Sequence, residues 1–299
     1  MNDKLKGYLS AIIAAVAYGT NPLGALFLYK EGLNPASVIF YRFVAAVAIL
    51  FIILKAKRVA LKINSFELKV LGSLGIIFAA SALTLYTSFN YMDSGIASTI
   101  LFAYPVMVAV IMALFFKEKA PFTTVIAIVL SIAGIVLLYQ GDGNAKLSLT
   151  GVMLVLASSL TYAVYIVIVN RAKLTLTPFK MTFYIMIFAA FTVFLYSLSS
   201  QANHLIMVPS WQALGWIVMS ACVPTVIAMT FLNIGIFYAG STPTAIMGAL
   251  EPVTAVIISV AIFDGMFTLR LLSGILLILG AVLLIIAGDK ILKKSPDGN

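Results

Sequence analysis

Long apolar runs, separated by short polar segments, recur along the whole of this chain. A helix needs about 20 such residues to cross the ~30 Å hydrocarbon core of a bilayer, and a water-soluble core has no use for so many runs. Of the 299 residues, 63% are apolar and 10% are charged. A membrane β-barrel would instead show alternating segments of ~10 residues. The sequence therefore predicts an all-α integral membrane protein embedded in the lipid bilayer.

The apolar runs predict ten transmembrane helices. They cover residues 5–29, 35–54, 68–89, 95–116, 121–139, 149–170, 180–200, 210–238, 243–263 and 270–288. The strongest break is a glycine-rich, charged segment that leaves five spans on each side. The predicted organisation is a first five-helix repeat over 1–139, a polar linker over 140–148, a second five-helix repeat over 149–289 and a cytoplasmic tail over 290–299.

The two halves contain the same segment twice. Residues 91–137 align with residues 238–284 at a constant offset of 147, which places Pro105 opposite Pro252. Because each half has an odd number of spans, the second half starts on the other side of the membrane, and the repeats are predicted to be inverted. Inverted halves can exchange roles around a central cavity, which favours alternating access by a transporter over an anchor or a receptor.

Basic residues gather on one side of the predicted topology. With the N-terminus inside, 15 of the 19 Lys and Arg residues fall in cytoplasmic segments, three fall outside and one, Arg42, lies within a span. This bias places both termini in the cytoplasm and predicts a multi-pass protein of the cytoplasmic (inner) membrane. Cytoplasmic loops also account for the net charge of +9, so we expect no nucleic-acid partner.

Four prolines lie inside predicted spans, namely Pro22, Pro105, Pro224 and Pro252. Each lacks an N–H and frees the carbonyl four residues earlier, which then needs protein or a water-filled cavity beside it. A packed kink is one interpretation of each proline. The repeat-related Pro105 and Pro252 could instead act as hinges or gates, and Gly248 beside Pro252 is where added bulk would block such a movement.

Two charged residues lie within the spans. Glu251 is the only carboxylate well inside one, and a buried carboxylate is expensive unless it is paired or protonated. It could take up a coupling proton, bind an ammonium group or form a structural ion pair. Arg42 could bind a substrate carboxylate bidentately, although snorkelling or capping of nearby carbonyls is the favoured interpretation. A direct pair between Arg42 and Glu251 is left open.

Tyrosines and asparagines occur at helical spacing, so that several pairs share one helix face. Their rings and amides could line an amphipathic pocket, although an interfacial or packing role is the alternative for any single tyrosine. The candidate substrate-binding residues are Tyr18, Asn21, Tyr86, Asn90, Tyr104, Tyr162, Tyr165 and Glu251. The candidate gating or coupling residues are Arg42, Pro105, Gly248, Glu251 and Pro252.

The remaining polar residues suggest no catalytic chemistry. One histidine, one cysteine and few carboxylates form no metal-ligand cluster, nucleophile motif or phosphate loop, so we expect no catalytic residue, metal, cofactor or enzymatic activity. Trp211 and Trp216 are predicted to be interfacial belt residues, and Asp93 and Asp264 to be solvated near span ends. One bundle could enclose its own cavity, and the sequence leaves the oligomeric state open.

Four motifs accompany the ten spans. They are Tyr18-Gly19-Thr20-Asn21-Pro22 in the first span, Arg42 in the second, Pro105 with Glu118 near the end of the fourth, and Leu250-Glu251-Pro252-Val253 in the ninth. Together with the two five-span repeats, they resemble the drug/metabolite transporter superfamily, specifically its EamA-type branch, over nearly the whole chain. The chain departs from the family pattern in having Tyr18 where tryptophan is common and Asp264-Gly265 where Gly-Glu is frequent.

The resemblance implies a basket-like bundle with a central cavity lined by spans one, three, four, six, eight and nine. Family members mostly export or exchange amino acids and other small metabolites without nucleotide hydrolysis. We therefore expect a secondary transporter whose small-molecule partner is an amphipathic metabolite, either an amino acid or a related amine. The alternatives are a proton- or cation-coupled importer of a small cationic metabolite and a membrane-embedded lipid-handling protein.

Overall fold

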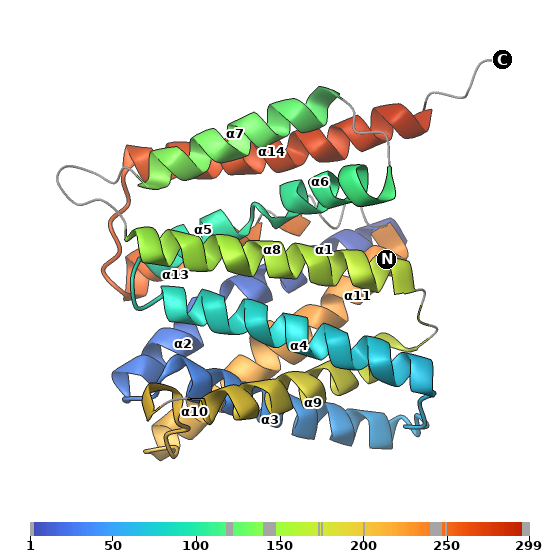
Figure 1. The fold of residues 1–299 in the computed structure, drawn as a ribbon, viewed down its shortest axis with the longest axis vertical. Coiled ribbons are helices and arrows are strands. Elements are labelled where there is room, and N and C mark those ends of the chain that lie inside the picture. Colours follow the sequence, from blue (N-terminus) through green and yellow to red (C-terminus); the bar gives the residue numbers. More distant parts are fainter. Residues whose placement is uncertain are drawn as a thin grey trace.

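The computed structural model in Figure 1 describes residues 3–117, 122–139, 148–172, 174, 176–199, 201–239, 247–248 and 250–294. Every regular element in these ranges is helical, which confirms the all-α prediction for them. The helices are α1 (Asp3–Gly19), α2 (Asn21–Lys30), α3 (Pro35–Ala56), α4 (Ser65–Ser88), α5 (Ser94–Leu101), α6 (Tyr104–Phe116), α7 (Phe122–Tyr139), α8 (Leu149–Ala172), α9 (Pro178–Ser197), η1 (Gln201–Asn203), α10 (Trp211–Ala221), η2 (Cys222–Ile227), α11 (Ala228–Ala239), α13 (Leu250–Ile262) and α14 (Leu269–Lys294). Glu118 and all of the predicted linker except Ser148 lie outside the described residues.

Many helical segments have the length and composition of membrane spans. Seven segments among the described residues qualify: Leu5–Lys30, Pro35–Ala56, Ser65–Ser88, Ser94–Phe116, Leu149–Val169, Pro178–Ser197 and Trp211–Leu232. Three shorter apolar helices are Val125–Leu137, Leu250–Ile262 and Leu269–Leu284. These lengths support the predicted multi-pass membrane protein. The total of ten spans and the inverted relation of the halves stay predictions.

Polar caps set where several helices begin. Asn34 accepts a hydrogen bond from the Ser37 N–H at the start of α3, and Ser210 caps α10 in the same way. At the start of α4, Asn64 and Glu67 form a reciprocal capping box. Such bonds satisfy N–H groups that have no partner inside the first helical turn. They therefore fix where the chain enters these apolar segments.

Helices that are distant in sequence pack lengthwise against each other. The pairs are α1 with α11, α4 with α8, α3 with α9, and α7 with α14. Figure 1 shows α7 and α14 together at one edge of the bundle and α3, α9 and α10 at the opposite edge, with the other helices between them. The start of α1 and the end of α14 lie at the same end of the bundle (Figure 1).

The outward faces of the bundle are apolar. Phe115 and Phe122, for example, are 76% and 77% exposed. A water-soluble monomer rarely exposes many such side chains together, whereas lipid tails accept them. Inside the bundle, Phe43, Leu74 and Ile185 are completely buried. The polarity of the chain is therefore arranged for a hydrocarbon surrounding.

Three long helical segments change conformation beside a proline. The chain passes from α1 to α2 at Thr20, just before Pro22, and from α5 to α6 just before Pro105. Around Pro224 the helix widens into the π-helical turn η2 between α10 and α11. Discontinuous helices of this kind often border the substrate site of a membrane transporter, because irregular backbone requires protein or water around it.

Two of the carbonyls freed by proline have hydroxyl partners. The Ser159 hydroxyl donates to the carbonyl of Leu101, four residues before Pro105, at 3.1 Å. The Thr225 hydroxyl donates to the carbonyl of Ser220, four residues before Pro224, also at 3.1 Å. These bonds replace the missing proline N–H groups and stabilise the breaks in the membrane interior.

Candidate functional site

Four tyrosines and one glutamate converge in the middle of the bundle, and we call them the central cluster. Its members are Tyr18 in α1, Tyr104 in α6, Tyr162 and Tyr165 in α8, and Glu251 in the first turn of α13. They are close enough to interact electrostatically with one another. The cluster therefore joins residues from both halves of the sequence.

The rings of the cluster are in direct contact. The centroids of Tyr104 and Tyr162 lie 4.8 Å apart with the rings nearly perpendicular, and those of Tyr162 and Tyr165 lie 5.8 Å apart with the rings parallel. Both arrangements are favourable for aromatic pairs. Phe102 extends the row with an edge contact to Tyr104. The result is an aromatic wall beside the carboxylate of Glu251.

The central cluster borders an internal space. Tyr18, Tyr104, Tyr162 and Glu251 lie deep among the protein atoms, yet each keeps a partly accessible side chain. Surface that is accessible at such depth lines an interior cavity. A carboxylate beside aromatic faces is suited to an ammonium group, which gains both charge attraction and cation–π contact.

Arg42 organises a second polar group next to the central cluster. Its guanidinium donates to the Tyr86 hydroxyl, to the Thr225 hydroxyl at 2.9 Å and to the carbonyl of Pro224 at 3.4 Å. The Tyr86 hydroxyl in turn donates to Asn21 at 3.4 Å. Arg42 is buried, so these bonds supply the partners that a desolvated cation requires. The network ties α3, α4, η2 and the start of α2 together.

Arg42 and Glu251 do not form an ion pair within the described part of the chain. The hydrogen bonds of Arg42 go to Tyr86, Thr225 and Pro224. No described Lys or Arg side chain lies next to the Glu251 carboxylate. Glu251 is therefore the better placed of the two to meet a charged ligand.

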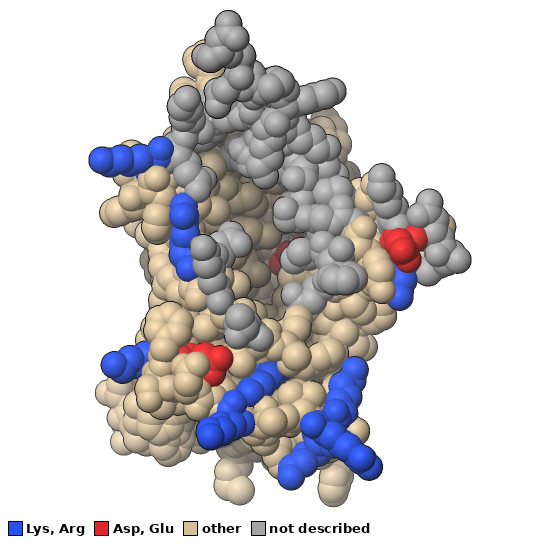
Figure 2. Space-filling model, turned by 90° about the vertical axis from the view of Figure 1, so that its right-hand side faces the viewer, with Lys and Arg blue, Asp and Glu red and all other residues tan. Residues whose placement is uncertain are grey.

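One end of the bundle is hollowed. Figure 2 looks at the end where α1 begins and shows a deep hollow with an acidic side chain at its bottom. Blue Lys and Arg side chains stand along the left and lower parts of this face and outnumber the red acidic ones (Figure 2). Basic residues mark the cytoplasmic side of membrane proteins, so the hollow opens on the face that the sequence assigns to the cytoplasm.

At the opposite end of the bundle lies an aromatic contact that we call the outer plug. It consists of Phe27, Lys30, Trp216 and Phe263. Phe27 stacks on Trp216 with centroids 4.3 Å apart and meets Phe263 at 5.2 Å. The Lys30 ammonium lies over the rings of Phe27 and Phe263 at 5.6 and 5.1 Å. The plug joins the end of α2 to α10 and to the residue after α13.

A polar contact joins two helices at the same end, beside the plug. The Ser259 hydroxyl of α13 donates to the Asp93 carboxylate at 2.5 Å, and Asp93 also caps α5. A Cβ at Gly95 would lie 3.0 Å from the Cα of Val256, so the two helices touch backbone to backbone. The expectation that Asp93 is simply solvated is wrong, because its carboxylate holds α5 and α13 together.

The predicted site residues fall into three groups. Tyr18, Tyr104, Tyr162, Tyr165 and Glu251 form the central cluster, and Asn21, Tyr86 and Arg42 form the adjoining network. Pro105 lies at the break between α5 and α6, Pro252 lies in the first turn of α13, and Gly248 precedes that helix. Asn90 lies apart from both groups, because α4 ends at Ser88 and the asparagine is exposed in the following turn.

Sequence reasoning overlooked several residues that the fold brings together. Thr225 is one, because only tertiary packing shows that it accepts from Arg42 while donating to Ser220. Trp216 is half-buried in the outer plug rather than a plain belt residue, whereas Trp211 is 87% exposed as the belt interpretation predicts. One available signal was the alignment of Phe263 with Phe116 at the ends of two repeat-related spans.

Comparison with known sequences gives a consistent result. The sequence model of the EamA-like transporter family matches residues 5–140 and 149–287. The uncharacterized transporter YyaM of Bacillus subtilis (strain 168) is 26% identical over 260 residues, which are 83% of this chain and 84% of that protein. The uncharacterized transporter sll1319 of Synechocystis sp. (strain ATCC 27184 / PCC 6803 / Kazusa) is 26% identical over 218 residues, 70% of this chain and 64% of that protein.

A known crystal structure has the same fold. The two chains superpose with a TM-score of 0.68 over 98% of this chain and 100% of the other, at 18% sequence identity. At this identity the likeness concerns the fold alone. The residues that carry function must therefore be argued from the central cluster itself.

Proposed function

The chain belongs to the EamA-like transporter family, and from this premise we propose that it is a secondary transporter that moves a small amphipathic metabolite across the cytoplasmic membrane by alternating access. The substrate class that we propose is an amino acid or a related amine, with export or exchange as the physiological direction. Its relatives are named as transporters, so we assign no enzymatic activity to the chain.

The observation that carries this proposal is Glu251 beside the aromatic rings of Tyr104 and Tyr162. The carboxylate supplies one charged pole, and the rings supply faces that bind a cation or an apolar body. A small amine can contact both the carboxylate and the aromatic rings. The hydroxyls of the tyrosines and the amide of Asn21 offer hydrogen bonds for the polar tip of the substrate.

Closure at one end and opening at the other support alternating access. The hollow opens at the basic end, while the outer plug and the contact between Ser259 and Asp93 close the other end. In our proposal this conformation is the inward-open state. Export would require the outer contacts to part and the basic end to close around the bound substrate.

Two structural details support the inverted repeat that alternating access uses. Lys117 and Asp264 stand 147 residues apart, and both have a φ of 55°, so the two repeat-related spans end in the same left-handed conformation. The packing of α1 on α11 also has a counterpart in that of α8 on α4. In a pair of five-span repeats, spans one and eight correspond to spans six and three.

Counterflow in proteoliposomes tests the proposal. The vesicles are loaded with an unlabelled pool of amino acids and amines, and the entry of single labelled compounds is followed. We expect transient accumulation of at least one amine-bearing compound, weakened in Glu251→Gln and retained in the control Glu67→Gln. Glu67 lies in a capping box at the surface, and glutamine preserves such a box. Absence of accumulation with folded protein in the bilayer would refute this substrate class.

A coupled importer of a small cationic metabolite is the second candidate, because no described cation neutralises Glu251. A carboxylate without a partner can carry a proton or a cation across the membrane. Imposed pH and sodium gradients distinguish the two candidates. Uptake against a concentration gradient only when such a gradient is present would favour the coupled importer, and gradient-independent exchange would favour our first proposal.

A further inference from the structure

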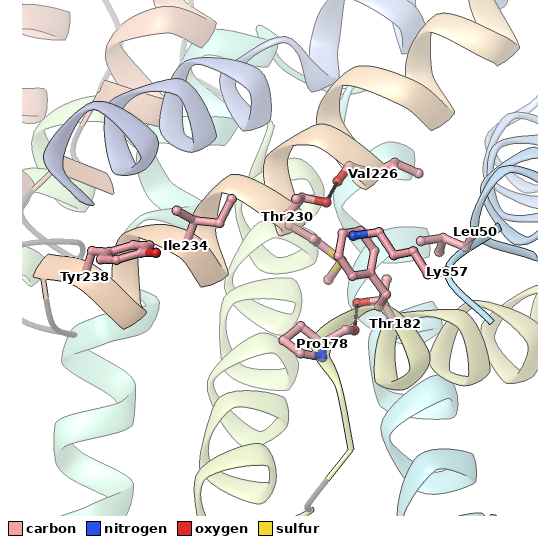
Figure 3. A pocket seen from close by; sticks show the side chains of 10 residues that line it. Leu50, Lys57, Pro178, Thr182, Val226, Thr230, Ile234 and Tyr238 are labelled. Atoms are coloured by element: carbon pink, nitrogen blue, oxygen red, sulfur yellow. Dashed lines mark hydrogen bonds between the residues drawn. The ribbon is translucent and has the colours of Figure 1, made fainter. Parts of the chain in front are cut away.

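A separate cavity of 570 Å³ lies between α3, α9 and α11, away from the central cluster. Its walls come from the end of α3, the start of α9 and most of α11, so it opens at the basic end of the bundle. Figure 3 shows its lining side chains, with Lys57 extending into it from the end of α3. The volume is in the usual range for a small-molecule site.

The lining is mainly apolar, and its polar residues are Lys57, Thr182, Thr230 and Tyr238. Leu50 and Val226 are buried at the inner end, and Ile234 continues the apolar wall along α11. Lys57 and Tyr238 stand near the helix ends. From Val226 to Tyr238 the wall measures about 18 Å at ~1.5 Å per residue. This is comparable to one leaflet of a ~30 Å hydrocarbon core.

Lys57 is the charged residue among those that line the cavity. Its ammonium lies 5.0 Å from the centroid of the Phe179 ring, and the side chain is exposed. The neighbouring Lys55 and Arg58 are also exposed, while the Lys180 ammonium is bound to the carbonyl of Lys62 at 2.6 Å. The mouth of the cavity therefore carries positive charge, and its interior is apolar.

The acidic group nearest in sequence does not cancel this charge. Glu67 belongs to the following helix and is held in its capping box by Asn64. A second cavity, of 640 Å³ between α6, α7 and α8, provides an internal contrast. Its described lining is apolar except for Ser131 and contains no charged residue. The lysine at the first cavity is therefore not a feature that both cavities share.

We propose that the cavity between α3, α9 and α11 seats one anionic phospholipid of the cytoplasmic leaflet. Its phosphate lies at Lys57, and an acyl chain runs along α11 towards Leu50 and Val226. Basic pockets between membrane helices on the cytoplasmic side recognise anionic headgroups in this way. The lipid fills the gap where α9 and α11 meet only sparsely, and it therefore stabilises the inner half of the bundle.

Native mass spectrometry of the full-length protein in neutral detergent tests the proposal. The probes are palmitoyl-oleoyl phosphatidylglycerol, phosphatidylcholine with the same chains, and inorganic phosphate. We expect one retained phosphatidylglycerol with a preference of about tenfold over phosphatidylcholine, which is ~1.4 kcal/mol. Lys57→Gln should reduce that preference to less than threefold, whereas Lys69→Gln, an exposed lysine outside the cavity, should preserve it.

Two further results would overturn the lipid site. If Lys57→Gln and Lys69→Gln weaken the preference equally, the attraction belongs to the whole basic face. If inorganic phosphate displaces the lipid at equal concentration, the site is one for a free anion. Ile234→Trp, which fills the apolar part, should reduce retention of both phospholipids. None of these measurements depends on transport, so their failure leaves the proposed function untouched.

Discussion

Tyr104 and Glu251 occupy equivalent positions in the two halves, 147 residues apart and each directly before a proline. Both side chains belong to the central cluster, where they interact electrostatically with each other. The same backbone position therefore supplies a phenol from one half and a carboxylate from the other. Among its described residues the central cluster therefore has one charged pole, which suits a substrate with one cationic group and an apolar body.

Glu251→Gln removes that charged pole while preserving the shape of the side chain. We expect an apparent substrate affinity roughly 30-fold weaker, because a charge-assisted interaction worth ~2 kcal/mol is lost. Counterflow over a range of substrate concentrations and pH values measures this change. Affinity and pH dependence like those of the wild type would make Glu251 structural, and a similar loss in Glu67→Gln would indicate a general defect.

The network of Arg42 is expected to act as a structural unit. Tyr86→Phe leaves a guanidinium N–H without its partner in a buried position, which costs ~1.5–3 kcal/mol in hydrogen bonding to a charged group. Arg42→Lys should destabilise the protein by a similar amount, because the lysine ammonium cannot reproduce the planar set of N–H donors of the guanidinium. A double-mutant cycle on thermal stability in detergent should show strong coupling. Additive effects would show that the two side chains act independently.

The sequence could identify the residues of the central cluster but not all of their neighbours. Helical spacing placed Tyr162 and Tyr165 correctly on one face. The same rule failed for Tyr86 and Asn90, because α4 ends at Ser88, two residues before Asn90. Contacts such as that between Arg42 and Thr225 join residues 183 positions apart, and no local pattern encodes them.

At the scale of elements, proline divides the fourth span into halves with different tasks. The outer half, α5, packs against α13 through Gly95 and Ser259. The inner half, α6, corresponds by the 147-residue offset to α13, and α5 corresponds to residues 241–248. If the repeats exchange roles, the contact between α5 and α13 should part when the inner end closes. Pro105 and Pro252 would then be the points about which the halves swing.

Gly248 provides a test of that movement. A Cβ there would lie 3.9 Å from the Phe102 ring, which is ordinary contact, so Gly248→Ala should be nearly neutral. Gly248→Leu should block turnover by filling the space beside the ring, while the protein stays folded. Flux and thermal stability are measured together, with Gly215→Leu as the control because its Cβ would point into open space. Normal flux in Gly248→Leu would remove the hinge proposal.

The outer plug should hold the inward-open state in place. Trp216→Ala removes a stacked ring worth ~0.5–1.5 kcal/mol beyond its buried area, so we expect the outward-open population to rise about tenfold. Labelling of Tyr162→Cys by an impermeant thiol reagent from outside, in a Cys222→Ser background, reports that population. Trp211→Ala, at an exposed position, should have no effect. Equal labelling in all variants would argue against a gate.

At the scale of the whole molecule, the periodic apolar runs predicted most of the helix positions within a few residues. The run predicted at 35–54 became α3 (Pro35–Ala56), and that at 149–170 became α8 (Leu149–Ala172). Apolar length alone suffices for this, because a helix in hydrocarbon must satisfy its own backbone. Which helices pair, and the π-helical form of η2, depend on side-chain contacts across the bundle and were not predictable.

Orientation is the property of the whole molecule on which the inward-open assignment depends. The basic end should face the cytoplasm, because Lys and Arg resist translocation. In intact cells carrying a Cys222→Ser background, Ala202→Cys between α9 and α10 should react with an impermeant thiol reagent. Lys62→Cys between α3 and α4 should react only after permeabilisation. The reverse pattern would turn the hollow of Figure 2 into an outward-facing entrance, and the same central cluster would then be displayed to substrates from outside.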